Sequence, residues 1–235
     1  MIMRKRNLST EINNISAILF SAGLCRDIAP LHRVIEDLKK SQFYNLQKLE
    51  IDIDEVPRNT RPNDVKLLKA ILTVQISESI YADNQIRNPI NNYIFSVELS
   101  GINQNGDKVH SSWHLDFDNS GTSEYMHPFF HLTYGGSTMK STEIGNVLLL
   151  PAPRLPYLPM DAILGIDFIL SNFIKKDKYN KLKSNSEYKS AVKNSQFRLW
   201  RPYMLSLASH WCNFTNCSHF DFDNNLSKKL CPTLI

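Results

Sequence analysis

The chain has 235 residues, of which 42% are hydrophobic and 21% are charged, and its formal net charge is +4. This composition is typical of a globular protein with a sizeable core. The mild positive charge permits contact with nucleic acid or an acidic partner without arguing for either. No stretch of about 18 or more apolar residues occurs, which excludes a membrane span at the level of sequence and favours a cytoplasmic protein.

The N-terminal segment has the order of an export signal, but its details favour a helix. The basic residues of MIMRKR precede an apolar stretch at residues 15–24. Glu11 and Asn13 interrupt the approach to that stretch, and no small-x-small cleavage site follows it. We therefore predict a helix here rather than an export signal.

Two helices are predicted before the first strand, within residues 8–45. The first begins near residues 9–10, where Ser and Thr are good N-caps, and it ends at Gly23. The second begins near residues 27–30 and carries apolar residues at helical spacing. Both helices should bury one apolar face against the rest of the protein.

Alternating apolar residues predict an antiparallel meander of about five or six strands within residues 47–150. An Asn-Gly turn inside residues 101–108 predicts a hairpin that leads into a strand at 109–117. Further strands are expected at 129–134 and 146–150. The apolar positions that mark the earlier strands are Leu49, Ile51 and Ile53, then Leu72, Val74 and Ile76, then Tyr93, Phe95, Val97 and Leu99.

Helices are also predicted after the sheet. An apolar helix is expected at 160–175, and a helix with one apolar face at 197–211. The lysine- and asparagine-rich segment at 175–190 is predicted to be an exposed loop or a frayed helix. The fold class is therefore α+β, with N-terminal helices, an antiparallel sheet and C-terminal helices packed on the sheet. We expect a single domain with a core over residues 1–175 and a helical C-terminal extension over 176–235.

Polar side chains gather at residues 113–136, a stretch that holds three of the seven histidines. Strand alternation places His114 and Asp116 on one face of the first strand in this stretch. It places His131 and Thr133 on one face of the second. If the two strands pair, cross-strand neighbours stand about 5 Å apart and a His–Asp–His cluster results.

Three interpretations of this cluster remain open. With His114, Asp116 and His131 as ligands, it is a site for a divalent transition metal such as zinc, manganese or iron. Without a metal, Asp116 orients a histidine that moves protons near neutral pH. The same residues can also be no more than the polar face of an antiparallel sheet. The residues predicted to support a functional cluster are Asp118, His127, Thr133 and Asp167.

Asp167 lies among apolar residues of the predicted helix at 160–175, where an aspartate is costly unless it is paired. It either faces solvent beside Ser171 or supports a histidine or an arginine across the sheet. Arg154, in the proline-rich bridge before this helix, is another candidate partner.

The C-terminal tail contains a weaker metal candidate. Its four candidate ligands are Cys212, Cys217, His219 and Cys231. These residue types bind zinc, but their spacing lacks the close cysteine pair of a zinc knuckle. Ordinary reduced cysteines are therefore the favoured interpretation.

Basic and aromatic residues mix in the segment FRLWRPY, at residues 197–203. Such residues can pack in a core, anchor a partner protein, or stack on bases and grip the phosphates of a nucleic acid. The sequence leaves all three interpretations open. The candidate binding residues are Arg198, Trp200, Arg201 and Tyr203.

No standard phosphate-binding loop or nucleophile motif occurs, so three functional hypotheses remain. The first is an accessory or adaptor subunit of a bacterial multi-protein assembly, which binds a partner protein and in some cases nucleic acid. The abundance of Asn, Lys and Ile suggests a mobile or defence element as its setting. The second is a metal-dependent hydrolase that acts on phosphodiesters, as nucleases do. The third is a metal-free protein that binds a small ligand or transfers protons at the same sheet face.

Overall fold

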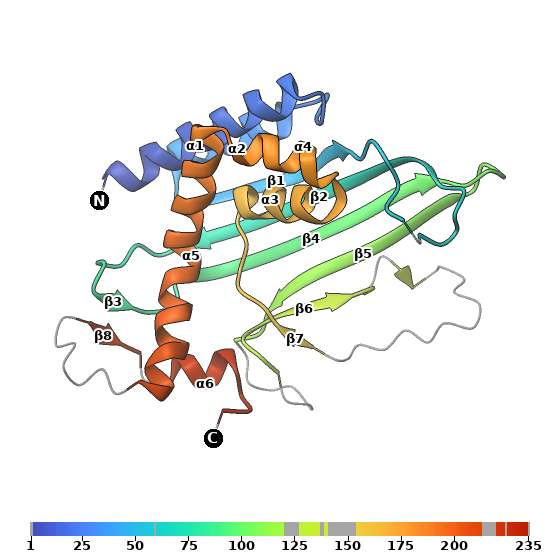
Figure 1. Cartoon of the computed structure of the whole chain (residues 1–235). Helices are drawn as coiled ribbons and strands as arrows, with labels where there is room; N and C mark the ends of the chain where they lie inside the picture. The colour runs from blue at the N-terminus through green and yellow to red at the C-terminus, as the bar shows by residue number, and fades with distance from the viewer. Residues whose placement is uncertain are drawn as a thin grey trace.

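The computed structural model describes residues 2–58, 60–119, 127–136, 139–140, 154–212, 220–223 and 225–234. Within these ranges, two helices precede a six-stranded antiparallel sheet and further helices follow it (Figure 1), which confirms the predicted α+β class. The helices are α1 (Ile2–Ser21), α2 (Ala29–Lys40), α3 (Ala162–Phe173), α4 (Lys176–Lys183), α5 (Ser186–Trp211) and α6 (Leu226–Leu230). The strands are β1 (Phe43–Asp52), β2 (Lys66–Glu78), β3 (Gln85–Ile86), β4 (Ile90–Ile102), β5 (Lys108–Phe117), β6 (Phe130–Tyr134), β7 (Leu155–Pro156) and β8 (Asp221–Phe222).

The large sheet is a meander in which neighbouring strands are antiparallel. Its order is β1-β2-β4-β5-β6-β7, while β3 and β8 form a separate parallel ladder. The predicted Asn-Gly turn joins β4 to β5. There Gly106 has a φ of +86°, and its N–H donates to the carbonyl of Asn103 over 3.1 Å. This turn sets the register in which Ser96 lies opposite His114.

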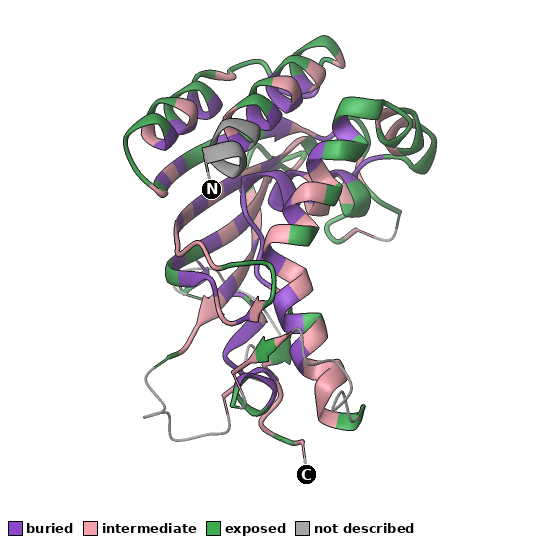
Figure 2. Ribbon diagram, turned by 90° about the vertical axis from the view of Figure 1, so that its left-hand side faces the viewer, coloured by how far each residue is buried: buried purple, intermediate pink, exposed green. Residues whose placement is uncertain are grey.

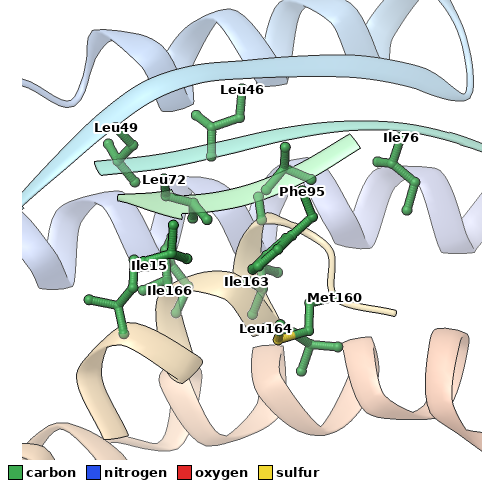
Figure 3. Packing of buried hydrophobic residues seen from close by; sticks show 14 of the residues in the cluster. Ile15, Leu46, Leu49, Leu72, Ile76, Phe95, Met160, Ile163, Leu164 and Ile166 are labelled. Atoms are coloured by element: carbon green, nitrogen blue, oxygen red, sulfur yellow. The ribbon is translucent and has the colours of Figure 1, made fainter. Parts of the chain in front are cut away.

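One face of the sheet packs against helices and forms the core. The predicted inward residues Leu49 and Leu72 are fully buried there, and Phe95 is almost so. Figure 3 shows Leu72 and Phe95 pointing toward Ile163 of α3. Gly165 allows this close approach, because a Cβ there would stand 2.9 Å from Phe95 and 3.0 Å from Leu72.

The opposite face of the sheet carries mostly polar side chains. Thr73, Gln75 and Ser96 lie on it and are partly exposed. Figures 1 and 2 show α3 and α5 on the other side of the sheet. This polar face therefore contains the side chains that the alternation of β5 directs away from the core.

Helix α1 is longer at its start than predicted and ends where predicted. It begins at Ile2 rather than near residues 9–10. At its end Gly23 has a φ of +66°, and the N–H of Leu24 donates to the carbonyl of Leu19 over 3.0 Å. This is the hydrogen-bond pattern with which a left-handed glycine ends a helix.

The segment at 175–190 is helical, although its composition predicts a loop or a frayed helix. It forms α4 and the start of α5. Asn185 caps α5, because its side chain accepts hydrogen bonds from the N–H groups of Glu187 and Tyr188. Tyr188 is then buried in the core, which stabilises the first turn. The predicted strand at 146–150 lies outside the described residues.

One hydrophobic cluster joins the two predicted parts of the chain. Leu199 and Tyr203 of α5 belong to the same cluster as Leu72 of β2. Residues of the 176–235 segment thus complete the core that the 1–175 segment begins. Among the helices described, none is long and apolar enough to cross a membrane.

Candidate functional site

The pairing of β5 with β6 brings the predicted histidines and aspartate together. His114 lies opposite Thr133, and Asp116 lies opposite His131. Opposed residues of antiparallel strands point to the same face, so these four side chains share the polar face of the sheet. Leu115, between them in sequence, is buried on the core face. The prediction that these side chains share one face is therefore confirmed.

Asp116 contacts two imidazole rings through one oxygen atom. Its Oδ2 lies 3.0 Å from Nε2 of His114 and 3.4 Å from Nε2 of His131. The other ring nitrogen of His131, Nδ1, lies 3.2 Å from the carbonyl oxygen of Pro128. Carbonyl and ionised carboxylate oxygens only accept hydrogen bonds. Each ring nitrogen of His131 therefore faces an oxygen that can only accept a hydrogen bond.

Hydrogen bonding favours the charged forms of His114 and Asp116. The pKa of His114 is raised, chiefly because its hydrogen bond to Asp116 stabilises the imidazolium. The pKa of Asp116 is lowered, since the hydrogen bonds from His114 and His131 outweigh the burial that favours the neutral acid. The side chains of His114 and Asp116 are 25% and 48% exposed, so the pair is accessible from solvent.

A second histidine–aspartate pair adjoins the first. The rings of His127 and His131 meet edge to face with centroids 4.2 Å apart, and Nδ1 of His127 lies 3.0 Å from Oδ2 of Asp118. Within the described part of the chain, this nitrogen nevertheless has no partner in hydrogen-bonding geometry. The pKa of His127 is lowered, first by burial and then by the positive charges of His131 and Arg154. His127 is thus the neutral ring of the cluster.

Thr133 and Gly136 also shape the cluster. Oγ1 of Thr133 is buried and has no hydrogen-bond partner among the described residues, which leaves a hydrogen bond for water or a ligand. Gly136 has a φ of +90°, and a Cβ there would lie 2.8 Å from Cε1 of His114. The glycine at the end of β6 therefore packs directly against the His114 ring.

The cluster does not have the geometry of the predicted metal site. No group of three or more His, Cys, Asp or Glu side chains in the described ranges is arranged to hold a metal ion. The Nε2 atoms of His114 and His131 lie 3.0 and 3.4 Å from Oδ2 of Asp116, within reach of a hydrogen bond to it. The hydrogen-bonded interpretation is the better supported one.

The weaker zinc candidate in the tail is only partly described. Cys212 is exposed, and Cys231 is partly exposed with its Sγ 3.4 Å from Oγ1 of Thr233. Cys217 and His219 lie outside the described residues. The two described cysteines give no support to a shared zinc site.

Asp167 is paired, but with neither of its predicted partners. Its Oδ1 accepts hydrogen bonds from the hydroxyl groups of Tyr179 and Tyr188, over 3.0 and 2.8 Å. It therefore joins α3 to α4 and α5 and does not support a histidine on the sheet. Arg154 acts on His127 instead, where its charge adds to the effect of burial on the pKa of that ring.

Two of the predicted binding residues of α5 lie in the interior. Arg198, whose side chain is only 11% exposed, lies between Glu11 and Asp161, at N–O distances of 2.9 and 3.1 Å. Tyr203 is fully buried, and its hydroxyl donates to Oδ1 of Asn88 over 2.5 Å. Their assignment to a binding surface is therefore corrected, because both residues hold α5 to the core.

The other two predicted binding residues of α5 are partly exposed. Nε1 of Trp200 donates to the carbonyl of Pro159 over 2.8 Å, and Arg201 donates to the carbonyl of Asp83 over 2.9 Å. Trp200 also lines an apolar cavity of about 330 Å³. Other residues that line this cavity are Tyr157, Leu158, Met204, Leu207 and Leu230.

Glu78, at the end of β2, is a candidate that the sequence prediction missed. In sequence it continues the inward-facing series Leu72, Val74 and Ile76. It lines a small cavity together with Arg198, and burial raises its pKa to about 7. A carboxylate that continues a buried series has to be paired, neutral or functional, and this signal was present in the sequence.

The histidine–aspartate cluster combines a ring whose pKa is raised with a ring whose pKa is lowered. Such a pair can donate a proton at one group and accept a proton at another without a metal. The imidazolium form of His114, which its raised pKa favours, and Arg154 supply positive charge beside the carboxylates of Asp116 and Asp118, so an anionic ligand can contact a cation at this face. Comparisons with protein-family models, curated proteins and solved structures find no match for this chain.

Proposed function

We propose that the cluster binds an anionic ligand and transfers protons to or from it without a metal. The supporting observation is that two histidines of one cluster have pKa values shifted in opposite directions. The hydrogen bond to Asp116 raises the pKa of His114, while burial and neighbouring positive charge lower that of His127. Environments that separate the pKa values of two neighbouring groups in this way mark the acid and the base of a site.

His114 is the proton donor in this proposal. Its pKa is raised, its ring is reachable from solvent, and Asp116 orients it. His127 is the proton acceptor, and the carboxylate of Asp118, 3.0 Å from its Nδ1, stabilises the proton that it takes up. Arg154 adds positive charge for the anionic group of the ligand.

A histidine titration followed by NMR, with chelator present, tests this proposal. The Cε1–H signal of His114 is expected to titrate above the ordinary value of 6.5 and that of His127 below it. Inorganic phosphate should shift both signals, and Asp116→Asn should weaken its binding, while Glu98→Gln on the same face should not. Titration of the two rings at the same pH would remove the basis of the proposal. Phosphate binding that vanishes on chelation would favour the metal-dependent hydrolase instead.

An accessory or adaptor subunit is a second candidate function, and one feature favours it. The apolar cavity beside Trp200 has Met204 on its wall, and Met204 is 53% exposed. Tryptophan and methionine at an apolar surface are typical of protein-binding sites. In this proposal the cavity takes an apolar side chain of a partner protein in a bacterial assembly. Nucleic acid is the weaker expectation, since Arg198 and Tyr203 are buried.

Affinity purification from the native host with two variants tests the second candidate. Met204→Asp places a charge in the cavity, while Lys193→Asp changes an exposed position of the same helix. Stoichiometric recovery of one protein with the wild type and Lys193→Asp, and its loss with Met204→Asp, supports a partner at this cavity. Equal recovery with all three forms, or no partner with any, counts against it.

A further inference from the structure

A small cavity beside α5 contains a carboxylate without an ion-pair partner of its own. We propose that this cavity, lined by Glu78 and Arg198, binds a primary alkylammonium group. A lysine side chain of another protein and a free aliphatic amine both carry this chemistry. The site is separate from the histidine–aspartate cluster and does not depend on the function proposed for that cluster.

The shape of the cavity suits a short aliphatic chain. Its volume is about 70 Å³, which is room for roughly five water-sized groups. Leu8 of α1, Leu38 of α2 and Phe197 of α5 supply apolar wall. Glu78 and Arg198 supply the charged groups. A methylene stem can therefore pack on the apolar wall while its charged end reaches Glu78.

The guanidinium of Arg198 is already occupied by two other carboxylates. It donates to Glu11 over 2.9 Å and to Asp161 over 3.1 Å. Its Nε–H is buried and has no partner among the described residues. Arg198 is therefore held in place by Glu11 and Asp161. The positive charge of its guanidinium is divided among these two carboxylates and Glu78.

The two arginines at the rim are occupied as well. Arg87 forms an ion pair with Asp221 at 2.5 Å. Arg201 donates to the carbonyl of Asp83 and lies over the ring of Phe197, with its guanidinium carbon 5.0 Å from the ring centroid. Neither contact involves Glu78. Neither arginine at the rim therefore forms an ion pair with Glu78 in these contacts.

Glu78 consequently carries the excess negative charge of the cavity. Among the described residues, the charges that act on its carboxylate are Arg198, which favours ionisation, and Asp161, which opposes it. Three carboxylates therefore face one guanidinium when Glu11 is included. A bound cation restores the balance, and an ammonium group does so with three hydrogen-bond donors in a small volume.

Titration of the full-length protein with n-butylamine and, separately, with 1-butanol tests this proposal. Binding is followed by NMR through the backbone amide signals of Ser79 and Gln85. The amine is expected to bind saturably and at least about tenfold more tightly than the alcohol. Binding of the amine should be about 30-fold tighter at pH 8.5 than at pH 5.5, because Glu78, with a pKa of about 7, is ionised at the higher pH. Nα-acetyl-lysine N-methylamide is the second probe. Binding of this probe identifies a protein-borne lysine as the ligand, and binding of n-butylamine alone identifies a free amine.

Two variants complete the test. Glu78→Gln should weaken amine binding at least about tenfold, whereas the matched Glu98→Gln, on the polar sheet face, should leave it unchanged. Equal binding of amine and alcohol, or an unchanged affinity in Glu78→Gln, overturns the proposal. If Glu78→Gln does not fold, the comparison of the two pH values in the wild type decides, and affinity that does not rise with pH overturns the proposal.

Discussion

Oδ2 of Asp116 lies 3.0 Å from Nε2 of His114, which is two residues earlier in the same strand. Residues two apart on a strand share a face, so this pair forms wherever the segment is a strand. The contact of Asp116 with His131, at 3.4 Å, requires the register between β5 and β6 as well. The cluster thus has one local contact and one tertiary contact, and the two can be tested separately.

The charged pair of His114 and Asp116 makes stability depend on pH. The pKa of His114 is raised in the folded protein. The stability that His114 contributes is therefore fully present below pH 6.5, the ordinary pKa of a histidine, and is lost as pH rises through the pKa of the folded state. Because the pKa of Asp116 is lowered from 3.8, its contribution is present above that value and is lost as pH falls through the folded value. The pair therefore stabilises most at mildly acidic pH.

Asp116→Asn should accordingly lower the free energy of unfolding by about 0.5–1 kcal/mol at pH 5.5, a small value because the carboxylate is half exposed. The deficit should shrink at pH 9, because less of His114 is protonated there than at pH 5.5. Urea unfolding at both pH values measures it, with Glu98→Gln as the control. An equal deficit at both pH values would contradict a charged pair.

Removal of Arg198 should strongly destabilise the protein. Arg198→Met leaves the carboxylates of Glu11 and Asp161 without a cation, and the side chain of Asp161 is fully buried. Breaking a buried pair in this way costs about 3–5 kcal/mol. Arg26→Met is the matched control, because Arg26 is 87% exposed in its ion pair and should change stability by less than about 1 kcal/mol. Similar losses in the two variants would show that the Arg198 network is not buried in solution.

Gly165 sets the distance between α3 and the sheet. Gly165→Ala should cost about 1–3 kcal/mol, because the new Cβ would stand 2.9 Å from Phe95 and 3.0 Å from Leu72. Leu72→Val removes one methylene beside this position. The double variant should lose less stability than the sum of the losses in the two single variants, as thermal or urea unfolding can show. If the losses of the two single variants add exactly, α3 lies farther from β2 than the contacts of Gly165 indicate.

Elemental mass spectrometry of protein purified without chelator separates the metal-free site from the metal-dependent hydrolase. We expect no stoichiometric transition metal, because no group of three or more His, Cys, Asp or Glu side chains among the described residues is arranged to hold one. About one metal per chain that is lost in His114→Ala and kept in Cys217→Ala would instead establish the hydrolase ligands. Loss in Cys217→Ala alone would place a zinc ion in the tail.

Local patterns in the sequence were enough to predict the sheet and the face on which the cluster lies. Alternation with a period of two residues marks a strand with one buried face, and it placed Leu72 inward and Asp116 outward before any contact was known. The Asn-Gly turn before Lys108 then fixed the hairpin of β4 and β5. The placement of Asp116 and His131 on one face followed, because both lie on polar faces of neighbouring strands, whereas the register that sets them opposite each other came only from the folded sheet.

Tertiary structure alone decided which polar residues are buried and what they pair with. Arg198 and Tyr203 have the composition of a binding surface, yet α5 turns them into the core. Glu11, which pairs with Arg198, is 187 residues away in sequence. The physical reason is that the free energy of a buried charge depends on its partners, and those partners come from segments that only the folded chain brings together.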